Sequence, residues 1–460
     1  MSNSLFSDFE GVSSKGWKQK IQVDLKGADY NDTLIWKNNE GIDVKPFYHS
    51  DEFESLPDTS INPKTTWAIS QFIQVNTAKD SNLKAIDAIS RGAENIIFHI
   101  KADHITPEEL FKNIDLSAVS IDIKCDFLSE EFTQKILDYT HHISNGSQVT
   151  IHTDIIGNLA QTGNWYANLK GDHIKFEAIV KSTNQFSIDL DLYQNAGATI
   201  IQQLAYGLAH CNEYLNSIDK ILTKDAKTSL NVTFCTAISS NYFFEIAKIR
   251  ALRLLWSTLA AEYGINTDCR IISTPSKRNK TIYDYNVNML RTTTECMSAI
   301  LGGTDVVYNL PYDVLFHESN EFGDRIARNQ LLVLKNESYF DKVNNAADGA
   351  YYIENITKQF AEKALLLFKD IEEQGGFLSQ LKEGTIQRKI KESATKEQAN
   401  FNAEELVLLG TNKHPNLADK MKNDLEVSPF LKVNKRKTLI EPIIQKRLSE
   451  NLEINRLNKE

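Results

Sequence analysis

The polar residues that could carry chemistry in this 460-residue chain stand singly at the ends of short apolar runs. These positions hold Asn76, Lys101, Lys124, Asp154, Asp191, Thr236, Pro275 and Asn309. An enzyme built as a β/α barrel places its catalytic groups at the carboxyl ends of its strands. Polar residues at such positions also cap the helix that follows each strand. For any one of them we therefore expect capping or solvation rather than catalysis.

The spacing of the ten histidines does not indicate a metal site. His141 and His142 are adjacent, so on a helix they point in different directions and cannot chelate as residues four apart could. His99 and His104 flank the end of one apolar run, where we expect a buried or solvated histidine rather than a ligand. The sequence also lacks GxGxxG, GxxxxGK[ST], HExxH and GxSxG. The common signatures of dinucleotide binding, phosphate binding, zinc proteases and serine hydrolases are therefore missing.

The composition is that of a globular protein, with 41% apolar and 24% charged residues. A net charge of −10 argues against general nucleic-acid binding, because that needs clustered Lys and Arg. The five cysteines include no CxxC pair, which favours a reducing cytoplasm over a disulfide framework. The sequence shows neither a signal peptide nor an apolar run of about 18 residues. We therefore expect a cytoplasmic protein that does not span a membrane.

Eight short β-branched runs alternate with amphipathic stretches from about residue 67 onward. The runs are Ala68–Val75, Asn95–Ile100, Ala118–Ile123, Gln148–Thr153, Gln185–Leu190, Asn231–Thr236, Cys269–Thr274 and Asp305–Leu310. Strands buried in a parallel sheet have this length and composition, and the stretches between them have helical periodicity. The alternation predicts an α/β fold, a (β/α)8 TIM barrel over residues 67–340. A doubly wound open sheet is the alternative, because alternation alone does not prove closure.

The two ends of the chain do not share this alternation. Residues 1–66 contain several aromatic residues, too many for a disordered tail, and predict an extended N-terminal arm that covers another surface. Helical periodicity after the last strand predicts a C-terminal helical extension over residues 341–430. Residues 431–460 are expected to form a basic helical tail.

Longer strings of the sequence resemble the methylmalonyl-CoA mutase family. Four blocks follow one another at the family's spacing: FFEIAKIRALRLLW (Phe243–Trp256), RTTTECMSAILGGTD (Arg291–Asp305), DRIARNQLLVLKNES (Asp324–Ser338) and GAYYIENIT (Gly349–Thr357). LYQNAGATIIQQLAYGLA (Leu192–Ala209) also resembles the family. The opening, with Trp17, DLKGADYNDTLIW (Asp24–Trp36) and GIDVKPFY (Gly41–Tyr48), resembles the small subunits specifically. The resemblance covers nearly the whole chain.

The chain departs from the family at positions that matter for catalysis. Catalytic members carry a histidine and a Gln-Thr-Ser-Gly run after the seventh strand, and these positions hold Ile272 and Thr274, Pro275, Ser276 and Lys277 here. Isoleucine has no donor and cannot polarise a thioester carbonyl. A tyrosine and two arginines found upstream in catalytic members are replaced by Asn62, Thr65 and Ser70. The resemblance therefore implies no catalytic residues in this chain.

The resemblance also implies how the cofactor is divided between chains. Catalytic members hold adenosylcobalamin in a flavodoxin-like domain whose Asp-x-His-x-x-Gly histidine ligates cobalt, and the present sequence contains no such motif. The implied function is that of a non-catalytic small subunit, with no cobalamin-binding domain, in a heterodimer that interconverts methylmalonyl-CoA and succinyl-CoA. A large catalytic partner chain would carry the cofactor, and none would be bound here. Trp17, Tyr30 and Trp36 are the expected interface anchors, because hot spots favour Trp and Tyr.

Three other functions remain open at this point. The chain could be an acyl-CoA-binding barrel with its own activity, the small subunit of a related acyl-CoA mutase, or a chaperone-like partner in cobalamin metabolism. Ile272 and Asn62 weigh against an independent enzyme. The missing P-loop weighs against a GTP-driven chaperone.

Overall fold

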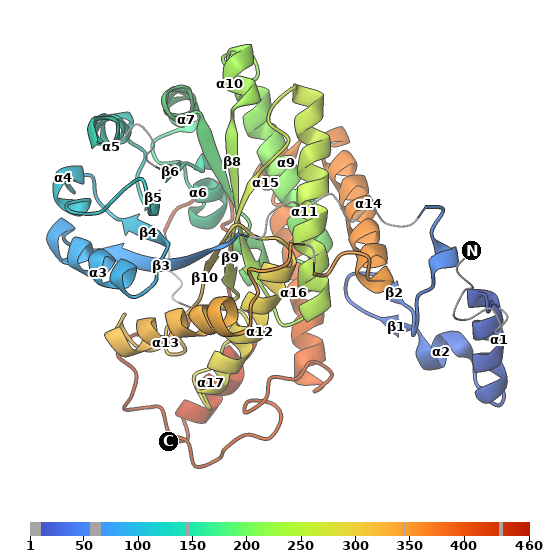
Figure 1. Ribbon diagram of the computed structural model, residues 1–460. Coiled ribbons are helices and arrows are strands. Elements are labelled where there is room, and N and C mark those ends of the chain that lie inside the picture. Colours follow the sequence, from blue (N-terminus) through green and yellow to red (C-terminus); the bar gives the residue numbers. More distant parts are fainter. Residues whose placement is uncertain (1–10, 56–65, 144–147, 345, 432–435) are drawn as a thin grey trace, which may run out of the picture.

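Eight parallel strands form the centre of the molecule in a computed structural model, which describes residues 11–55, 66–143, 148–344, 346–431 and 436–460 (Figure 1). The strands are β3 (Ala68–Val75), β4 (Asn95–Ile100), β5 (Ser120–Cys125), β6 (Val149–His152), β7 (Gln185–Asp189), β8 (Asn231–Ile238), β9 (Arg270–Pro275) and β10 (Val306–Tyr308). Their hydrogen-bonded order is β6-β5-β4-β3-β10-β9-β8-β7. The first and last strands of the series therefore pair directly, with Ala68 opposite Val306.

The sheet curls until its outer strands, β6 and β7, face each other. Ser187 N donates to Thr153 O at 3.3 Å, and Gln185 Nε2 donates to Val149 O at 3.5 Å. Among the described residues no ladder of paired residues joins these two strands. The barrel predicted from the sequence is confirmed, and the β6–β7 seam is its most weakly hydrogen-bonded side.

Helices surround the strands in the predicted alternation. They are α3 (Ala78–Ser90), α4 (Pro107–Leu110), α5 (Glu130–Ile143), α6 (Ile155–Thr162), α7 (Leu169–Thr183), α8 (Asp191–Asn195), α9 (Ile200–Ile218), α10 (Lys224–Thr228), α11 (Tyr242–Tyr263), α12 (Val287–Leu301) and α13 (Glu321–Leu332). Helix α11 shows why they pack as they do. Its apolar residues recur at helical spacing, and Trp256 is buried against Phe234 of β8 with ring centroids 5.6 Å apart. Within the described ranges, no helix has the length and hydrophobicity needed to cross a bilayer.

The C-terminal region is less helical than its sequence predicts. Among the described C-terminal residues, α17 (Glu450–Leu457) is the only helix that follows α14 (Tyr351–Glu373), α15 (Phe377–Lys382) and α16 (Thr385–Asn402). Described residues between 403 and 449 form turns and extended chain, whereas helix was expected to about residue 430 and again in the tail. Proline removes a helical hydrogen bond, and Pro415, Pro429 and Pro442 interrupt this stretch.

Residues 436–449, called the strap from here on, lie across the ends of several barrel elements. Leu439 N and Ile440 N both donate to Gly163 O at the end of α6. Ile443 N donates to Ala160 O, also on α6, at 2.7 Å. Lys446 N donates to Asn195 O, the last residue of α8, at 3.2 Å. The strap therefore joins the helix after β6 to the helix after β7 and bridges the seam.

The N-terminal arm projects from the side of the barrel (Figure 1). It contains α1 (Ser14–Asp24), α2 (Tyr30–Leu34) and a hairpin of β1 (Trp36–Lys37) and β2 (Asp43–Val44). The hairpin is anchored, because the Glu40 carboxylate accepts hydrogen bonds from Ile200 N at 2.9 Å and Ile201 N at 3.1 Å. A carboxyl oxygen suits this position as an acceptor, since the first amides of α9 lack partners within the helix. Helix α1 has no buried residue.

Candidate functional site

A buried ionic cluster lies in the interior of the barrel. The Asp122 carboxylate receives hydrogen bonds from Arg270 Nη1 at 2.5 Å and Nη2 at 2.8 Å, and from Asn95 Nδ2 at 2.7 Å. His152 Nε2 lies 2.7 Å from the same carboxylate. Burial alone would raise the pKa of Asp122, but the Arg270 guanidinium and the His152 ring outweigh burial and hold that pKa well below its usual range. The negative charge of Asp122 is therefore balanced by Arg270 inside the cluster.

Apolar side chains fill the rest of the interior. Ile272 is buried beside Cys235 of β8 and Val306 of β10, its register partners on the neighbouring strands. The Phe72 ring lies 5.4 Å from Tyr308. Ile272, the position at which the resemblance implies a histidine in catalytic members, thus makes apolar contacts at the centre of this barrel. Asn62 and Thr65 lie outside the described residues.

Two of the polar residues at strand ends support the fold, as expected from their types. Asp154 caps α6 by accepting a hydrogen bond from Gly157 N at 2.7 Å. It also accepts from the Tyr214 hydroxyl at 2.7 Å and lies 3.0 Å from His210 Nε2. Asn309 Nδ2 donates to Ala327 O at 3.0 Å and to Gln330 Oε1 at 2.9 Å. Both side chains are committed to neighbouring elements.

Four titratable residues form a cluster at the mouth of the barrel, and the sequence pointed to only two of them. Lys124 and Asp191 are among the residues singled out from the sequence, whereas Asp189, the last residue of β7, and Cys235 of β8 are not. Burial alone would lower the pKa of Lys124, but Cys235, Asp189 and Asp191 raise it above its usual value. Burial raises the pKa of Asp191 to about 7 and that of Cys235 to about 12. Cys235 is therefore a protonated thiol, which is a poor nucleophile.

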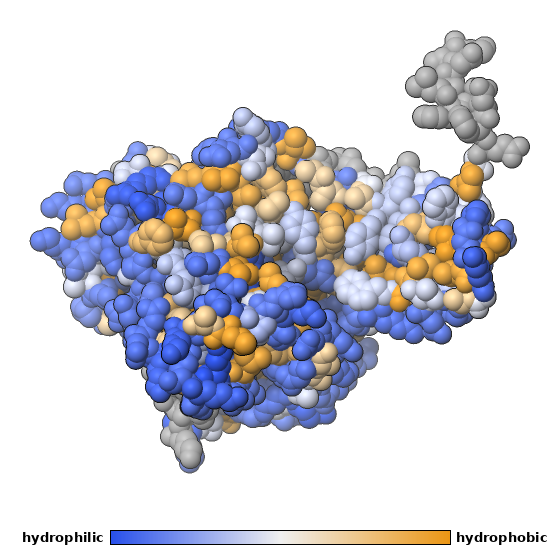
Figure 2. Space-filling model, turned by 90° about the horizontal axis from the view of Figure 1, so that it is seen from below, coloured by the Kyte–Doolittle hydropathy of each residue, from blue (hydrophilic) through white to orange (hydrophobic). Residues whose placement is uncertain are grey.

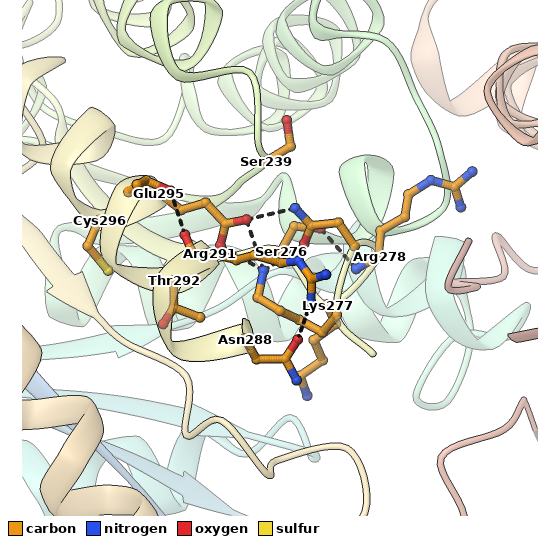
Figure 3. A network of polar contacts seen from close by, with 12 residues as sticks. Ser239, Ser276, Lys277, Arg278, Asn288, Arg291, Thr292, Glu295 and Cys296 are labelled. Atoms are coloured by element: carbon orange, nitrogen blue, oxygen red, sulfur yellow. Dashed lines mark hydrogen bonds and ion pairs between the residues drawn. The ribbon is translucent and has the colours of Figure 1, made fainter. Parts of the chain in front are cut away.

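The loop after β9 forms a second buried network (Figure 3). Lys280 Nζ lies 2.7 Å from Glu295 Oε2, and Asn279 Nδ2 donates to Glu295 Oε1 at 2.7 Å. Burial lowers the pKa of Lys280 and raises that of Glu295, and their mutual attraction opposes both shifts. Ser276 Oγ donates to Gln194 Oε1 at 2.6 Å. Ser276, for which the resemblance implies a place in the catalytic Gln-Thr-Ser-Gly run, therefore ties this loop to α8.

The strap covers this loop. Arg278, which Figure 3 shows turned away from Glu295, donates through Nη1 to Lys446 O at 2.7 Å. Arg447 Nη1 donates to Lys280 O at 3.2 Å and pairs with Glu453 Oε2 at 2.6 Å. The face where a barrel enzyme would bind its substrate is thus in contact with the chain's own C-terminal residues.

Adenosylcobalamin, the cofactor implied by the resemblance, needs a histidine to ligate its cobalt, and three histidines near the barrel interior are already engaged by protein partners. Near the mouth, His152 is bound to Asp122, and His99 Nε2 lies 2.7 Å from Asp126 Oδ1. His210 contacts the Tyr193 hydroxyl through Nδ1 at 3.0 Å and Asp154 through Nε2. Across the described ranges, no three His, Cys, Asp or Glu side chains are grouped to hold a metal ion.

The three expected interface anchors differ in exposure. Trp17 is 53% exposed and Trp36 is 50% exposed. Trp17 touches Phe47 edge-on at 5.9 Å, and the Trp36 ring lies 5.4 Å from Phe244 of α11. Tyr30 is only 6% exposed, with the Lys18 ammonium 4.6 Å from its ring. Tyr30 therefore supports the arm from within, and the two tryptophans present apolar surface.

Comparison with known proteins agrees with the fold. The sequence matches the family described as methylmalonyl-CoA mutase over residues 101–455. It is 34% identical to the methylmalonyl-CoA mutase small subunit of Porphyromonas gingivalis, over 90% of this chain and 72% of that protein. It is 28% identical to a methylmalonyl-CoA mutase of Rhizobium meliloti, over 90% of this chain and 64% of that protein.

The large subunit of the Porphyromonas gingivalis mutase is also related. It is 27% identical, over 82% of this chain and 61% of that protein. The chain thus spans about two thirds of the length of the relatives it matches. On the extent of these matches, this chain belongs to the methylmalonyl-CoA mutase family.

Proposed function

We propose that this chain is the non-catalytic small subunit of a cytoplasmic, heterodimeric, adenosylcobalamin-dependent methylmalonyl-CoA mutase. A large partner chain carries the cofactor and isomerises methylmalonyl-CoA to succinyl-CoA. The observation that carries the proposal is the filled barrel, in which Ile272 and the Asp122–Arg270 pair occupy the interior. The higher identity to the small subunit, 34% against 27% for the large subunit of the same organism, supports it.

The filled interior argues against an acyl-CoA-binding barrel with its own activity. A substrate that separated Arg270 from Asp122 would leave a buried charge without its partner, at a cost of about 3–5 kcal/mol. Ile272 would offer the thioester carbonyl no hydrogen bond in return. The radical chemistry of the reaction is supplied by the cofactor, which the proposal assigns to the partner chain. In the complex, this chain contributes a rigid surface for the partner.

The arm is the surface that we assign to the partner. Exposed apolar side chains on it include Val12, Trp17, Val23 and Trp36. Figure 2 shows hydrophobic residues scattered among polar ones on this projecting lobe. Helix α1 has no buried residue, so its exposed apolar side chains, Trp17 and Val23, would gain further burial against another surface. The Glu40 contacts hold the base of the arm on the barrel.

Assembly with the large chain tests the proposal. Co-expression of the two chains should yield a 1:1 complex in native mass spectrometry. Trp17→Ala should weaken the complex by about 2 kcal/mol or more, because exposed tryptophans are typical hot spots. Leu417→Ala, at an exposed apolar position outside the arm, is the matched control and should leave the affinity unchanged. A full-length chain that never associates with the large chain would remove the small-subunit assignment.

The small subunit of a related acyl-CoA mutase is the second candidate. It shares the filled barrel and the arm, so it differs only in the substrate of the partner. Turnover of the purified complex with methylmalonyl-CoA and with other branched acyl-CoA esters decides between the two.

A further inference from the structure

A cavity of about 180 Å³ lies where the strap meets the mouth of the barrel. This is far more than the 10–15 Å³ that one water molecule needs. Its walls come from the loop after β9, the end of α8, the strap and the chain before residue 432. The residues that line it and matter for its chemistry are Lys277, Arg278, Lys446, Arg447, Phe430 and Glu450.

Two buried arginines form the fixed part of this cavity. Arg278 is held by Glu397, 2.6 Å from its Nε, and by the carbonyl of Lys446. Arg447 is held by Glu453 at 2.6 Å, and its guanidinium lies 6.0 Å from the Phe430 ring. These partners neutralise the arginines and keep them in place. The two arginines therefore shape the cavity, and its net charge is set by the other side chains that line it.

Lys277 and Lys446, which are both exposed, add two positive charges to the lining, and Glu450 adds one negative charge. Among the described residues, neither Lys277 nor Lys446 has a carboxylate within ion-pairing distance. Lys446 Nζ donates only to the Asn451 amide oxygen, at 3.2 Å. Desolvation by the surrounding protein lowers the pKa of Lys277, and the attraction of Asp191 only partly offsets this. Glu450 is the one carboxylate of the lining, and it accepts a hydrogen bond from Leu431 N.

We propose that this cavity binds a small organic anion. Its phosphate or carboxylate head would lie between Lys277 and Lys446, and its apolar body against Phe430 and the neighbouring Leu315. Charge-assisted hydrogen bonds to two ammonium groups favour such a head, and the apolar wall favours a ligand larger than inorganic phosphate. The site is separate from the arm and from the barrel interior. It stands on this chain alone, whether or not the chain pairs with a large subunit.

Isothermal titration of the full-length chain tests the proposal with three probes: inorganic phosphate, phenyl phosphate and benzoate. We expect saturable 1:1 binding of phenyl phosphate or benzoate, and the tighter of the two identifies the head group. Inorganic phosphate should bind roughly tenfold more weakly than phenyl phosphate, because it buries no ring. The double variant Lys277→Gln, Lys446→Gln should lower the affinity by about tenfold or more.

Lys79→Gln is the matched control, since Lys79 is an exposed lysine on α3. It should bind each probe as the unaltered chain does. Thermal unfolding of every variant, followed by circular dichroism, shows that the fold is kept. The proposal is overturned if none of the three probes binds saturably at millimolar concentration. Equal affinity in the double variant and the unaltered chain would overturn it as well.

Discussion

Asp122 shows how the interior of this barrel is stabilised at the scale of single residues. Its carboxylate is buried and accepts hydrogen bonds from both terminal nitrogens of Arg270. It also contacts His152 and Asn95. Removing one partner of such a pair leaves an uncompensated buried charge. Arg270→Leu should therefore lower the free energy of unfolding by about 3–5 kcal/mol, measured by urea denaturation.

The pH dependence of stability has a definite sign here. The folded-state pKa of Asp122 is lowered from 3.8, so its contribution is present above that value and is lost as the pH falls below it. Arg270→Leu should remove this acid-sensitive contribution. Lys135→Ala, which breaks an exposed pair with Glu131, is the control and should cost less than about 1 kcal/mol. A cost for Arg270→Leu no larger than for this control would show that the buried pair is not stabilising.

Ile272 tests whether one side chain separates this barrel from a catalytic one. Ile272→His restores the residue type found in catalytic members, but it places an imidazole among Ile97, Cys235 and Val306. We expect no mutase turnover from the isolated variant and a lower thermal midpoint, because the ring lacks a partner in an apolar cluster. Turnover of methylmalonyl-CoA by this variant would contradict our account of the interior.

Glu40 links two elements, the hairpin of the arm and the N-terminus of α9. Burial raises its pKa from 4.5 to about 7, despite the hydrogen bonds from Ile200 N and Ile201 N. The folded state therefore prefers the protonated carboxyl. Its stabilising contribution is complete below about pH 4.5 and is lost as the pH rises through 7. Between pH 5 and 8, stability should fall by more in the unaltered chain than in Glu40→Gln.

Hydrogen exchange of the Ile200 and Ile201 amides measures the local effect of the same change. These amides should exchange faster in the unaltered chain at pH 8 than at pH 5, after correction for the intrinsic rate. The difference should be smaller in Glu40→Gln. Asp191, whose pKa is also raised to about 7, contributes equally to both proteins and cancels in the comparison. Identical pH profiles for the two proteins would show that Glu40 does not couple the arm to the barrel.

The strap acts at the scale of elements by bridging the β6–β7 seam. Ile443 is 4% exposed and belongs to the main apolar core, whereas its neighbour Ile444 is 41% exposed. Ile443→Ala should cost about 2–5 kcal/mol and speed hydrogen exchange in β6 and β7. Ile444→Ala is the matched control and should change both far less. Unchanged exchange at the seam in Ile443→Ala would show that the strap does not hold the two strands together.

For the whole molecule, the sequence predicts the barrel well and its extensions poorly. All eight predicted runs overlap observed strands, because strands buried on both faces are continuous β-branched runs. The strap has no such pattern. Its backbone groups pair with Gly163, Asn195 and Arg278, which are distant in sequence, so no local signal reveals them. The same holds for Glu40, whose partners are 160 residues away.

The candidate site could be predicted only in part. The resemblance implies that Ile272 stands where catalytic members have a histidine, and the structure shows its side chain buried in an apolar cluster. The Asp122–Arg270 pair joins side chains 148 residues apart and carries no motif. Trp17, Tyr30 and Trp36 look alike in the sequence, yet Tyr30 is buried under Lys18 in the arm. Exposure depends on tertiary packing, which the local pattern does not contain.

The most direct measurement for the central claim is mutase turnover of the purified chain, alone and with the large chain. Each sample is incubated with adenosylcobalamin, passed through gel filtration and assayed with methylmalonyl-CoA, and its cobalamin absorbance is recorded. We predict neither absorbance nor turnover for this chain alone, and both for the mixture, in a peak that contains the two chains. Turnover or retained cobalamin in the sample that holds only this chain would contradict the account.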